Sequence, residues 1–380
     1  MKRILVLATG GAGGDLQPLM AVALKLASRG HELVFSGDLS VAATVQPLGI
    51  ETIVAPPEHD LGPRLFAVYR DAQGLEQSAQ GDHVRQQIAF WSAELAPAVQ
   101  RLIHERKPDL LLTSLFGASV ASLACSKANM PWCVINSTFY IGPNPPRSLE
   151  SDFAPNSVTL NRYFLAVLEE AHLVLHATDQ IFDYNYTPLP GHHRYVGPLI
   201  WEADAPMPSY LDEPGDPWVL ATISSQLQDD IPLARAALNA LAHRQVRVVL
   251  TLGGGHQLAE LGAVPSNARV EQYIPHSRVL ERSKLLISHA GHGSVMKALW
   301  YGVPMVLMPW GRDQPGVANR AERLGVAKVI ARDRVTDELL AHAVQLVLED
   351  QHIRATASQV ARRLQTQDPV ATACDFLEQV

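Results

Sequence analysis

A cluster of histidine, glycine and serine residues follows a buried apolar segment in the second half of the chain. The apolar segment is Leu285–Ile287, and the cluster consists of His289, Gly291, His292, Gly293 and Ser294. The residues after Ser294 have apolar side chains at i,i+4 spacing, which predicts a helix. A strand that feeds a helix through a glycine-rich turn directs backbone N–H groups and the positive helix end at one place. The sequence therefore predicts an anion site suited to phosphate, with His289 and Ser294 as additional side-chain donors.

Asp313 and Gln314 follow the next apolar segment, Met305–Pro309. If that segment is a strand of a parallel sheet, both side chains lie at its carboxyl end, where α/β sheets bind ligands. They add polar groups at this edge of the sheet and are candidate ligand contacts. The alternative is that they only begin a helix before Pro315.

The first loop of the chain is rich in glycine. It follows an apolar strand at residues 3–8 and runs through Gly10, Gly11, Gly13 and Gly14 to Asp15. The dinucleotide fingerprint GxGxxG fails, because its third glycine would be Leu16, and a phosphate loop of the GxxxxGK type fails for want of a lysine. A dehydrogenase of the Rossmann class loses its main support.

These loops must be positioned by alternating strands and helices. Apolar strands are predicted at residues 3–8, 32–35, 52–55, 110–112, 132–136, 173–176, 194–196, 218–223, 246–252, 269–272, 285–287, 305–309 and 326–330. Helical periodicity lies between many of them, including a long helix at 84–106 that contains Pro97. The proline-rich segment 198–217 predicts a linker. The pattern predicts an α/β fold with two parallel sheets.

The composition describes an ordinary globular chain of 380 residues, long enough for two domains. A formal charge of −7 gives no basic surface for nucleic acid. The three scattered cysteines have no metal-binding spacing and favour a reducing, cytoplasmic setting. No apolar run reaches the ~20 residues of a transmembrane helix, and the short apolar start reads as a strand rather than a signal peptide.

The sequence HAGHGS from His289, with GVPM from Gly302 and DQ at Asp313, resembles the donor-binding signature of family-1 glycosyltransferases. Tyr273-Ile274-Pro275-His276 stands upstream in register. The resemblance extends from Ala8 to Gly325. It implies the GT-B fold, in which two Rossmann-like domains face each other across a cleft. We expect an acceptor-binding domain at 1–197, a linker at 198–217, a nucleotide-sugar-binding domain at 218–365 and a terminal helix at 366–380 that returns to the first domain.

The resemblance also implies residue roles in donor binding. The phosphates would contact the turn of His289, Gly291, His292, Gly293 and Ser294, together with the serine loop of Ser224 and Ser225. Tyr273 would stack on the base, the Ile274 backbone would read its edge, and Asp313 and Gln314 would hold the sugar. The alternatives are a serine turn that caps the helix at 229–241, with Asp229 and Asp230 as helix-start charges, and a Tyr273 ring that is core. No Asp-x-Asp element suggests a metal ion.

Two departures from the family pattern concern Asp15 and Lys297. Many members have histidine at the position of Asp15, whereas the antibiotic and sterol branch has aspartate there. Asp15 is therefore the candidate general base, and its alternative role is a helix cap. Lys297 replaces a ribose-binding glutamate, so it either contacts a phosphate or is solvated, and the choice between uracil and thymine donors stays open.

The expected activity is inverting, metal-independent transfer of a sugar from a UDP- or dTDP-sugar to a hydroxyl of a small hydrophobic acceptor, without a cofactor. Phe139 and Tyr140, after the strand at 132–136, are candidate acceptor contacts that could equally be core. The alternatives are transfer to a lipid-linked sugar, because Gly10–Pro18 also resembles the loop of a peptidoglycan glycosyltransferase, a nucleotide-sugar 2-epimerase on the same fold, and a noncatalytic partner protein.

Overall fold

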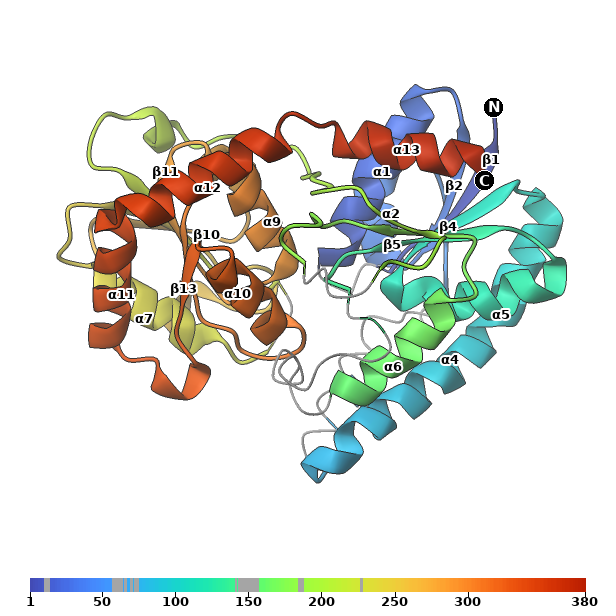
Figure 1. Ribbon diagram of the computed structural model, residues 1–380, viewed down its shortest axis with the longest axis horizontal. Helices are drawn as coiled ribbons and strands as arrows, with labels where there is room; N and C mark the ends of the chain where they lie inside the picture. The colour runs from blue at the N-terminus through green and yellow to red at the C-terminus, as the bar shows by residue number, and fades with distance from the viewer. Residues whose placement is uncertain are drawn as a thin grey trace. The chain divides into compact units, whose positions relative to one another are not determined.

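The computed structural model describes residues 1–9, 14–56, 64, 67–68, 71, 75–140, 142, 157–183, 188–225 and 228–380 (Figure 1). The chain forms two compact units. The first comprises Met1–Trp201 and Asp368–Val380, and the second comprises Glu202–Gln367. Gly10, Gly11 and Gly13 of the first loop lie outside the described residues.

The first unit contains a parallel sheet of seven strands in the order β3-β2-β1-β4-β5-β6-β7. Its strands are β1 (Arg3–Leu7), β2 (Glu32–Gly37), β3 (Glu51–Val54), β4 (Leu110–Ser114), β5 (Trp132–Asn136), β6 (Leu173–His176) and β7 (His193–Tyr195). Its helices are α1 (Leu16–Ser28), α2 (Leu39–Val45), α4 (Gln77–Arg106), α5 (Ala118–Ala128), α6 (Ser157–Leu168) and α13 (Pro369–Gln379), with short 3₁₀ turns at Gln46–Leu48 and Leu115–Gly117. The chain runs outward from β1 to β3 and returns on the other side of β1 at β4, so the strand order reverses between β1 and β4.

Alternation of side chains along the strands divides the core of this unit into two layers. Ile4 and Val6 of β1 pack with buried residues of α1 and α13. Leu5, between them, packs with buried residues of α4 and α5 on the opposite face. This period of two, with both faces buried, explains why the strands read as continuous apolar runs.

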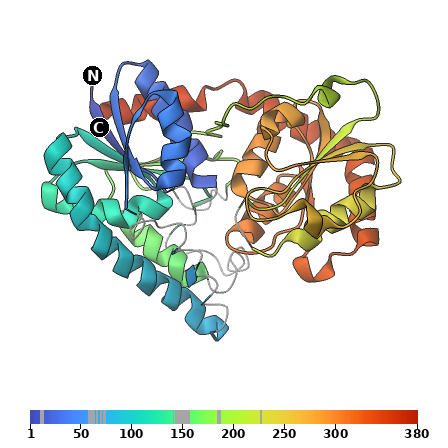
Figure 2. The same ribbon diagram turned by 180° about the vertical axis from the view of Figure 1, so that it is seen from behind.

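The C-terminal helix α13 packs beside α1, although the two are far apart in the sequence (Figures 1 and 2). Arg29, at the end of α1, pairs with Asp375 at 2.7 Å and with Glu378 at 2.9 Å. Leu377 and Cys374 are buried in the same core layer as β1. The last residues of the chain therefore complete the first unit.

The second unit contains a parallel sheet of six strands in the order β10-β9-β8-β11-β12-β13. Its strands are β8 (Trp218–Thr222), β9 (Arg247–Thr251), β10 (Ala268–Glu271), β11 (Ser283–Ser288), β12 (Met305–Leu307) and β13 (Ala327–Val329). Its helices are α7 (Ile231–Leu241), α8 (His276–Leu280), α9 (His292–Tyr301), α10 (Gln314–Arg323), α11 (Asp337–Glu349) and α12 (Gln351–Leu364), with 3₁₀ turns at Ser209–Asp212, Leu258–Leu261 and Arg332–Arg334. The strand order reverses between β8 and β11.

The segment predicted as a linker belongs largely to this second unit, which begins at Glu202. Leu211, in the 3₁₀ turn, is buried, and its carbonyl accepts a hydrogen bond from Trp218 Nε1 at 3.3 Å. The prolines prevent a long helix or strand here, but they do not prevent the segment from packing. Proline content alone therefore predicted the extent of the linker poorly.

The predicted strands are all present, and the α/β fold class is confirmed. No helix among the described residues is long and apolar enough to cross a membrane. The strand order reverses beside β1 in the first unit, whose loop leads to Asp15, and between β8 and β11 in the second unit, whose loops carry Ser224 and His289. Such a reversal is the usual ligand site of these sheets.

Candidate functional site

The turn between β11 and α9 begins at His289 and brings its ring against the backbone. Ala290 adopts the left-handed conformation, with φ of 66°, whereas Gly291 has an ordinary φ of −60°. A Cβ on Gly291 would lie 2.5 Å from His289 Nε2. Glycine is thus needed at position 291 to admit the histidine ring, not to turn the chain.

The first turn of α9 presents backbone donors. Gly291 is the N-cap, and the first intrahelical bond of the helix runs from the Val295 amide to the Gly291 carbonyl at 3.1 Å. The amides of Gly293 and Ser294 precede that bond, so they have no acceptor within the helix. Nothing lies within 4 Å of the position of a Cβ on Gly293, which leaves room for a ligand to approach the backbone. This geometry is suited to phosphate oxygens.

His289 is a buried imidazole beside this turn. Burial lowers the pKa of its imidazole, against the opposing effect of the Asp230 carboxylate. His289 Nδ1 is buried and has no hydrogen-bond partner among the described residues. His292 is buried in the first turn of the helix.

The serine loop after β8 lies beside this turn, because Thr222 of β8 pairs with Ser288 of β11. Ser224 is buried and Ser225 is exposed. Gly253, with φ of 63°, allows the loop after β9 to approach, since a Cβ there would lie 2.9 Å from Ser225 Cα. Two neighbouring loops thus bring hydroxyl and amide groups to one edge of the sheet.

Asp230 organises the serine loop, and sequence reasoning missed it. Its carboxylate is fully buried and accepts hydrogen bonds from the Ser224 amide at 2.7 Å and from Gln228 Nε2 at 3.1 Å. The other oxygen lies 3.3 Å from His256 Nε2, and His256 Nδ1 lies 3.2 Å from Glu260. As predicted, Asp230 stands at the start of α7, at its N-cap position, but its side chain makes no cap bond there and is directed to the serine loop instead. One indication of this role was present in the sequence, because Asp230 lies only a few residues after Ser224 and Ser225.

Gln314 organises the loop after β12. Its Oε1 accepts hydrogen bonds from the Trp310 amide at 2.8 Å and the Gly311 amide at 3.0 Å, while its Nε2 donates to Gln228 Oε1 at 3.0 Å. The carboxamide predicted to hold the sugar is therefore engaged within the protein. The bond to Gln228 joins the loops on either side of β11.

Asp313 is half-buried at the N-cap position of α10, and its carboxylate accepts no hydrogen bond from the first turn of that helix. Asp313 and Gln314 do begin a helix before Pro315, as the alternative predicted, but the Asp313 side chain makes no cap bond. Asp313 stays a candidate sugar ligand.

Tyr273 lies on the surface of the second unit, with 50 % of its area exposed. Its hydroxyl donates to the Ala203 carbonyl at 3.0 Å, and the neighbouring Ile274 is buried. The alternative of a core tyrosine is wrong. An exposed aromatic face held by its hydroxyl is suited to stacking on a base.

Lys297 is neither solvated nor directed to a phosphate. It is only 5 % exposed, and its Nζ lies 2.8 Å from Glu202 Oε1. Glu202 also accepts the amides of His276 at 2.8 Å and Ser277 at 3.0 Å. Burial opposes ionisation of Glu202. The Lys297 ammonium and the hydrogen bond from Ser277 outweigh burial and lower the pKa of the Glu202 carboxyl. The ammonium is thus committed to a buried ion pair.

In the first unit, Asp15 and Ser137 meet at the carboxyl edge of the sheet. Asp15 is buried just before α1 and accepts a hydrogen bond from the Ser137 hydroxyl, which follows β5. Its backbone is already helical and its side chain makes no cap bond, so the capping alternative is wrong. A side chain from a distant strand therefore orients this carboxylate.

Phe139 and Tyr140, predicted as acceptor contacts, are core residues in the structure. Both are buried. The Tyr140 ring packs at 5.1 Å from His176 and 5.2 Å from His193, and its amide donates to Asp183 at 2.7 Å. Their burial favours the alternative that both are core residues.

Comparison with known proteins shows which enzymes this chain is similar to. Residues 235–375 match the family described as erythromycin biosynthesis protein CIII-like, C-terminal domain. The demethyllactenocin mycarosyltransferase of Streptomyces fradiae is 24 % identical over 97 % of this chain and 84 % of its own length. The 4'-demethylrebeccamycin synthase of Lentzea aerocolonigenes is 26 % identical over 99 % of this chain and 99 % of its own length. These similarities support the resemblance to family-1 glycosyltransferases of the natural-product branch.

Solved structures agree with this resemblance at the level of the fold. The calicheamicin glycosyltransferase CalG4 has a TM-score of 0.78 at 20 % identity and covers all of this chain and 98 % of its own. The spinosyn rhamnosyltransferase SpnG, in a complex with thymidine diphosphate, has a TM-score of 0.75 at 18 % identity, with 99 % and 100 % covered. The predicted GT-B fold of this glycosyltransferase is thereby confirmed.

Proposed function

We propose that this glycosyltransferase transfers a sugar, with inversion and without a metal ion, from a nucleoside diphosphate-sugar to a hydroxyl of a small hydrophobic acceptor. The observation that carries the proposal is the connected edge formed by the loops after β8, β11 and β12. There, the Ser224 hydroxyl, the amides of the first turn of α9 and the His289 imidazole lie on loops that follow neighbouring strands. Hydrogen bonds through Asp230, Gln228 and Gln314 join the loops after β8 and β12.

The chemical need that this edge meets is stabilisation of the departing diphosphate. As the bond between the sugar and the phosphate breaks, negative charge grows on the phosphate oxygens. Fixed amides at a helix end and a neutral histidine donor can stabilise that charge without reorganising. Asp313 would hold the sugar through its hydroxyls, and Gln314 would hold the loop that carries Asp313. Tyr273 would stack on the base.

Asp15 is the proposed general base. In a single displacement the acceptor oxygen attacks the anomeric carbon, its proton passes to the carboxylate, and the diphosphate leaves from the opposite side, which inverts the configuration. The Ser137 hydroxyl donates to Oδ1 of Asp15 and fixes the orientation of the carboxylate.

Lys297 bears on the choice of nucleotide donor, and the cysteines bear on the cellular setting. Lys297 stands where the family has a ribose-binding glutamate, so this position has no carboxylate for a ribose hydroxyl. The Lys297 ammonium is instead paired with Glu202. We therefore infer that UDP- and dTDP-sugars are both accepted. The relative SpnG binds thymidine diphosphate. The three cysteines are free and buried, in keeping with the proposed cytoplasmic setting.

The test is incubation of the purified protein with UDP- and dTDP-sugars, with and without phenolic acceptors. Chromatography would follow the glycoside and the released nucleoside diphosphate, and proton NMR would give the anomeric configuration before and after transfer. We expect release that depends on the acceptor, resists chelators and inverts the anomeric centre. Isomerisation of the donor without an acceptor would instead identify an epimerase, and transfer only to lipid-linked sugars would identify the other glycosyltransferase class.

A further inference from the structure

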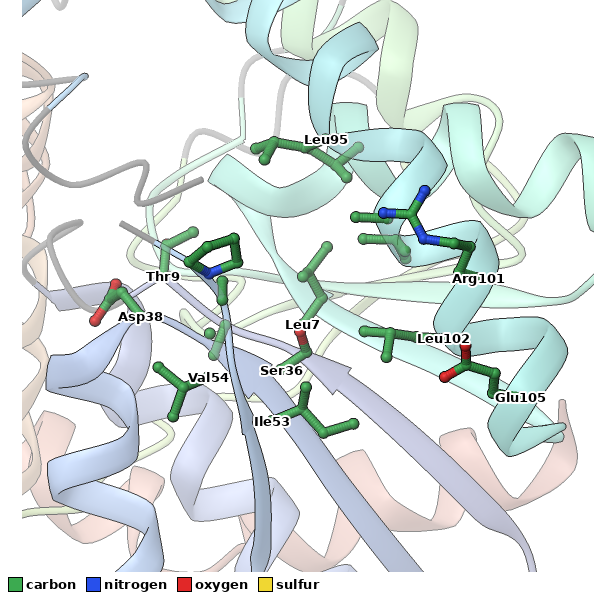
Figure 3. A pocket seen from close by; sticks show the side chains of 17 residues that line it. Leu7, Thr9, Ser36, Asp38, Ile53, Val54, Leu95, Arg101, Leu102 and Glu105 are labelled. Atoms are coloured by element: carbon green, nitrogen blue, oxygen red, sulfur yellow. The ribbon is translucent and has the colours of Figure 1, made fainter. Parts of the chain in front are cut away.

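A groove in the first unit lies between the edge strand β3 and helix α4 (Figure 3). It has a volume of about 210 Å³. Its walls are mostly apolar and include Leu7 of β1, Val54 of β3 and Leu102 of α4. Val54 keeps 39 % of its area exposed. Exposed apolar walls of this kind favour a ligand with an apolar body.

The polar groups of the groove lie at its two ends (Figure 3). Thr9 and Asp38 are at one end, and Arg101 and Glu105 are at the other. Thr9 is 5 % exposed, and its Oγ1 is buried with no hydrogen-bond partner among the described residues. The Asp38 carboxylate, in contrast, caps α2 through the amides of Ser40 and Val41. Thr9 is thus the polar group at that end that still lacks a partner.

The groove leads away from the edge of the sheet that carries the general base. Thr9 follows β1, and the same loop continues to Asp15. The opposite end lies near the start of β3, because Arg106, next to Glu105, pairs with Glu51 at 2.8 Å. A ligand in the groove would therefore have one end near the catalytic loop and an apolar body directed along the sheet.

We propose that the β3–α4 groove binds the apolar substituent of the acceptor, so that acceptors with an unbranched alkyl chain on a hydroxyl-bearing ring are favoured, with the polar end of the acceptor at Thr9. This inference rests on the proposed function and adds the class of acceptor to it. An apolar cavity of about 150 Å³ holds benzene, so the groove admits an alkyl chain of comparable or somewhat greater bulk.

Binding of para-alkylphenols, from methyl to heptyl, tests the proposal by calorimetry without a nucleotide sugar. Complete burial of a methylene strengthens binding by about fourfold. We expect the affinity of the wild-type protein to increase by roughly two- to fourfold per methylene until the groove is full. An affinity that does not depend on chain length would overturn the proposal.

Two variants of α4 locate the binding site. Ala98→Phe fills the groove, which Ala98 lines, whereas Ala93→Phe places the same ring at an exposed position of the same helix. We expect Ala93→Phe to keep the increase with chain length and Ala98→Phe to abolish it while still binding the methyl compound. An equal increase in all three proteins would place the alkyl chain elsewhere and refute the groove as its site.

Thr9→Val tests the orientation of the ligand, since it removes the hydroxyl and keeps the shape. We expect a similar loss of about three- to tenfold for every chain length. Unchanged affinities would show that the polar end of the ligand does not lie at Thr9. Turnover with UDP- and dTDP-sugars separates the two proposals: binding in the groove with no transfer to any acceptor would refute the proposed function alone, and transfer that is insensitive to chain length would refute the groove alone.

Discussion

The carboxyl edges of the two sheets are built in different ways. In the second unit, buried polar side chains join neighbouring loops: Asp230 holds Ser224, and Gln228 connects to Gln314. In the first unit, the buried carboxylate of Asp15 accepts a hydrogen bond from the Ser137 hydroxyl, and the groove that Thr9 lines has mostly apolar walls. A diphosphate requires donors at fixed positions, whereas an apolar acceptor is held by burial, which has no direction. If the proposed roles hold, the donor edge of the second unit fixes its ligand through directed polar contacts, and the acceptor edge of the first unit selects mainly through shape.

The largest expected effect concerns the acceptor edge. Asp15→Asn keeps the shape of the side chain and removes the base, so we expect turnover to fall by roughly 10²–10⁴. Donor affinity and melting temperature should stay near those of the wild-type protein, because Asp15 does not cap α1. Ser137→Ala is the matched control and should lose less, since the carboxylate remains. Turnover of Asp15→Asn within a few-fold of wild type would assign the base to another residue.

The donor edge depends in turn on a buried ion pair. Lys297→Met would leave the Glu202 carboxylate buried without its cation, which costs about 3–5 kcal/mol of unfolding free energy. Adding Glu202→Gln should restore most of that loss. Urea unfolding of the three proteins at neutral pH measures the effect. An unchanged free energy of unfolding in Lys297→Met would show that the ion pair is not needed for stability.

The same pair predicts a dependence on pH. The folded state holds the pKa of Glu202 below its ordinary value of 4.5. Its contribution is therefore complete above that pH and is lost as the pH falls through the lower, folded-state pKa. The difference between wild type and Lys297→Met should thus be largest at neutral pH and should shrink in acid. A difference that grows in acid would contradict this assignment.

Asp230 tests whether the framework of the serine loop matters for transfer. Asp230→Asn keeps the volume but cannot keep all of the hydrogen bonds, so we expect kcat/KM for the donor to fall by roughly 10–100-fold and stability to fall by about 1–3 kcal/mol. Asp229→Asn is the control: Asp229 has φ of 57°, a conformation that asparagine tolerates. Equal kinetics in both variants would remove Asp230 from the donor framework.

A smaller effect is expected at the sugar. Asp313→Ala should lower turnover by about tenfold and make the enzyme less selective among donor sugars, because a sugar hydroxyl would lose its partner. Asp333→Ala, at an exposed position of the same unit, should change neither. If the sugar preference of Asp313→Ala equals that of wild type, this residue does not hold the sugar.

The smallest difference should lie between nucleotides. With Lys297 paired to Glu202, selectivity for uridine over thymidine diphosphate-sugars should stay within about a hundredfold, or near 2.7 kcal/mol. Steady-state kinetics with matched pairs of donors measures it. A larger preference would mean that another residue contacts the ribose 2′-hydroxyl.

The sequence by itself determined the strands and the turn at His289, and it indicated the resemblance to family-1 glycosyltransferases. Strands buried on both faces must be apolar throughout, and a phosphate turn must place glycine and hydroxyl residues at fixed spacing, so both leave a local record. Gly302 is an example, since it ends α9 in the left-handed conformation that its position predicts.

Only the tertiary structure decided how polar side chains are used. Asp230, Gln314 and Lys297 have partners that are distant in the sequence or lie on other loops, and no local pattern specifies those partners. Phe139 and Tyr140 illustrate the same limit: an aromatic pair after a strand suits a pocket or a core equally, and the neighbouring strands made it core. Spacing along the chain fixes which groups are available, but desolvation and packing fix which of them are left to meet a ligand.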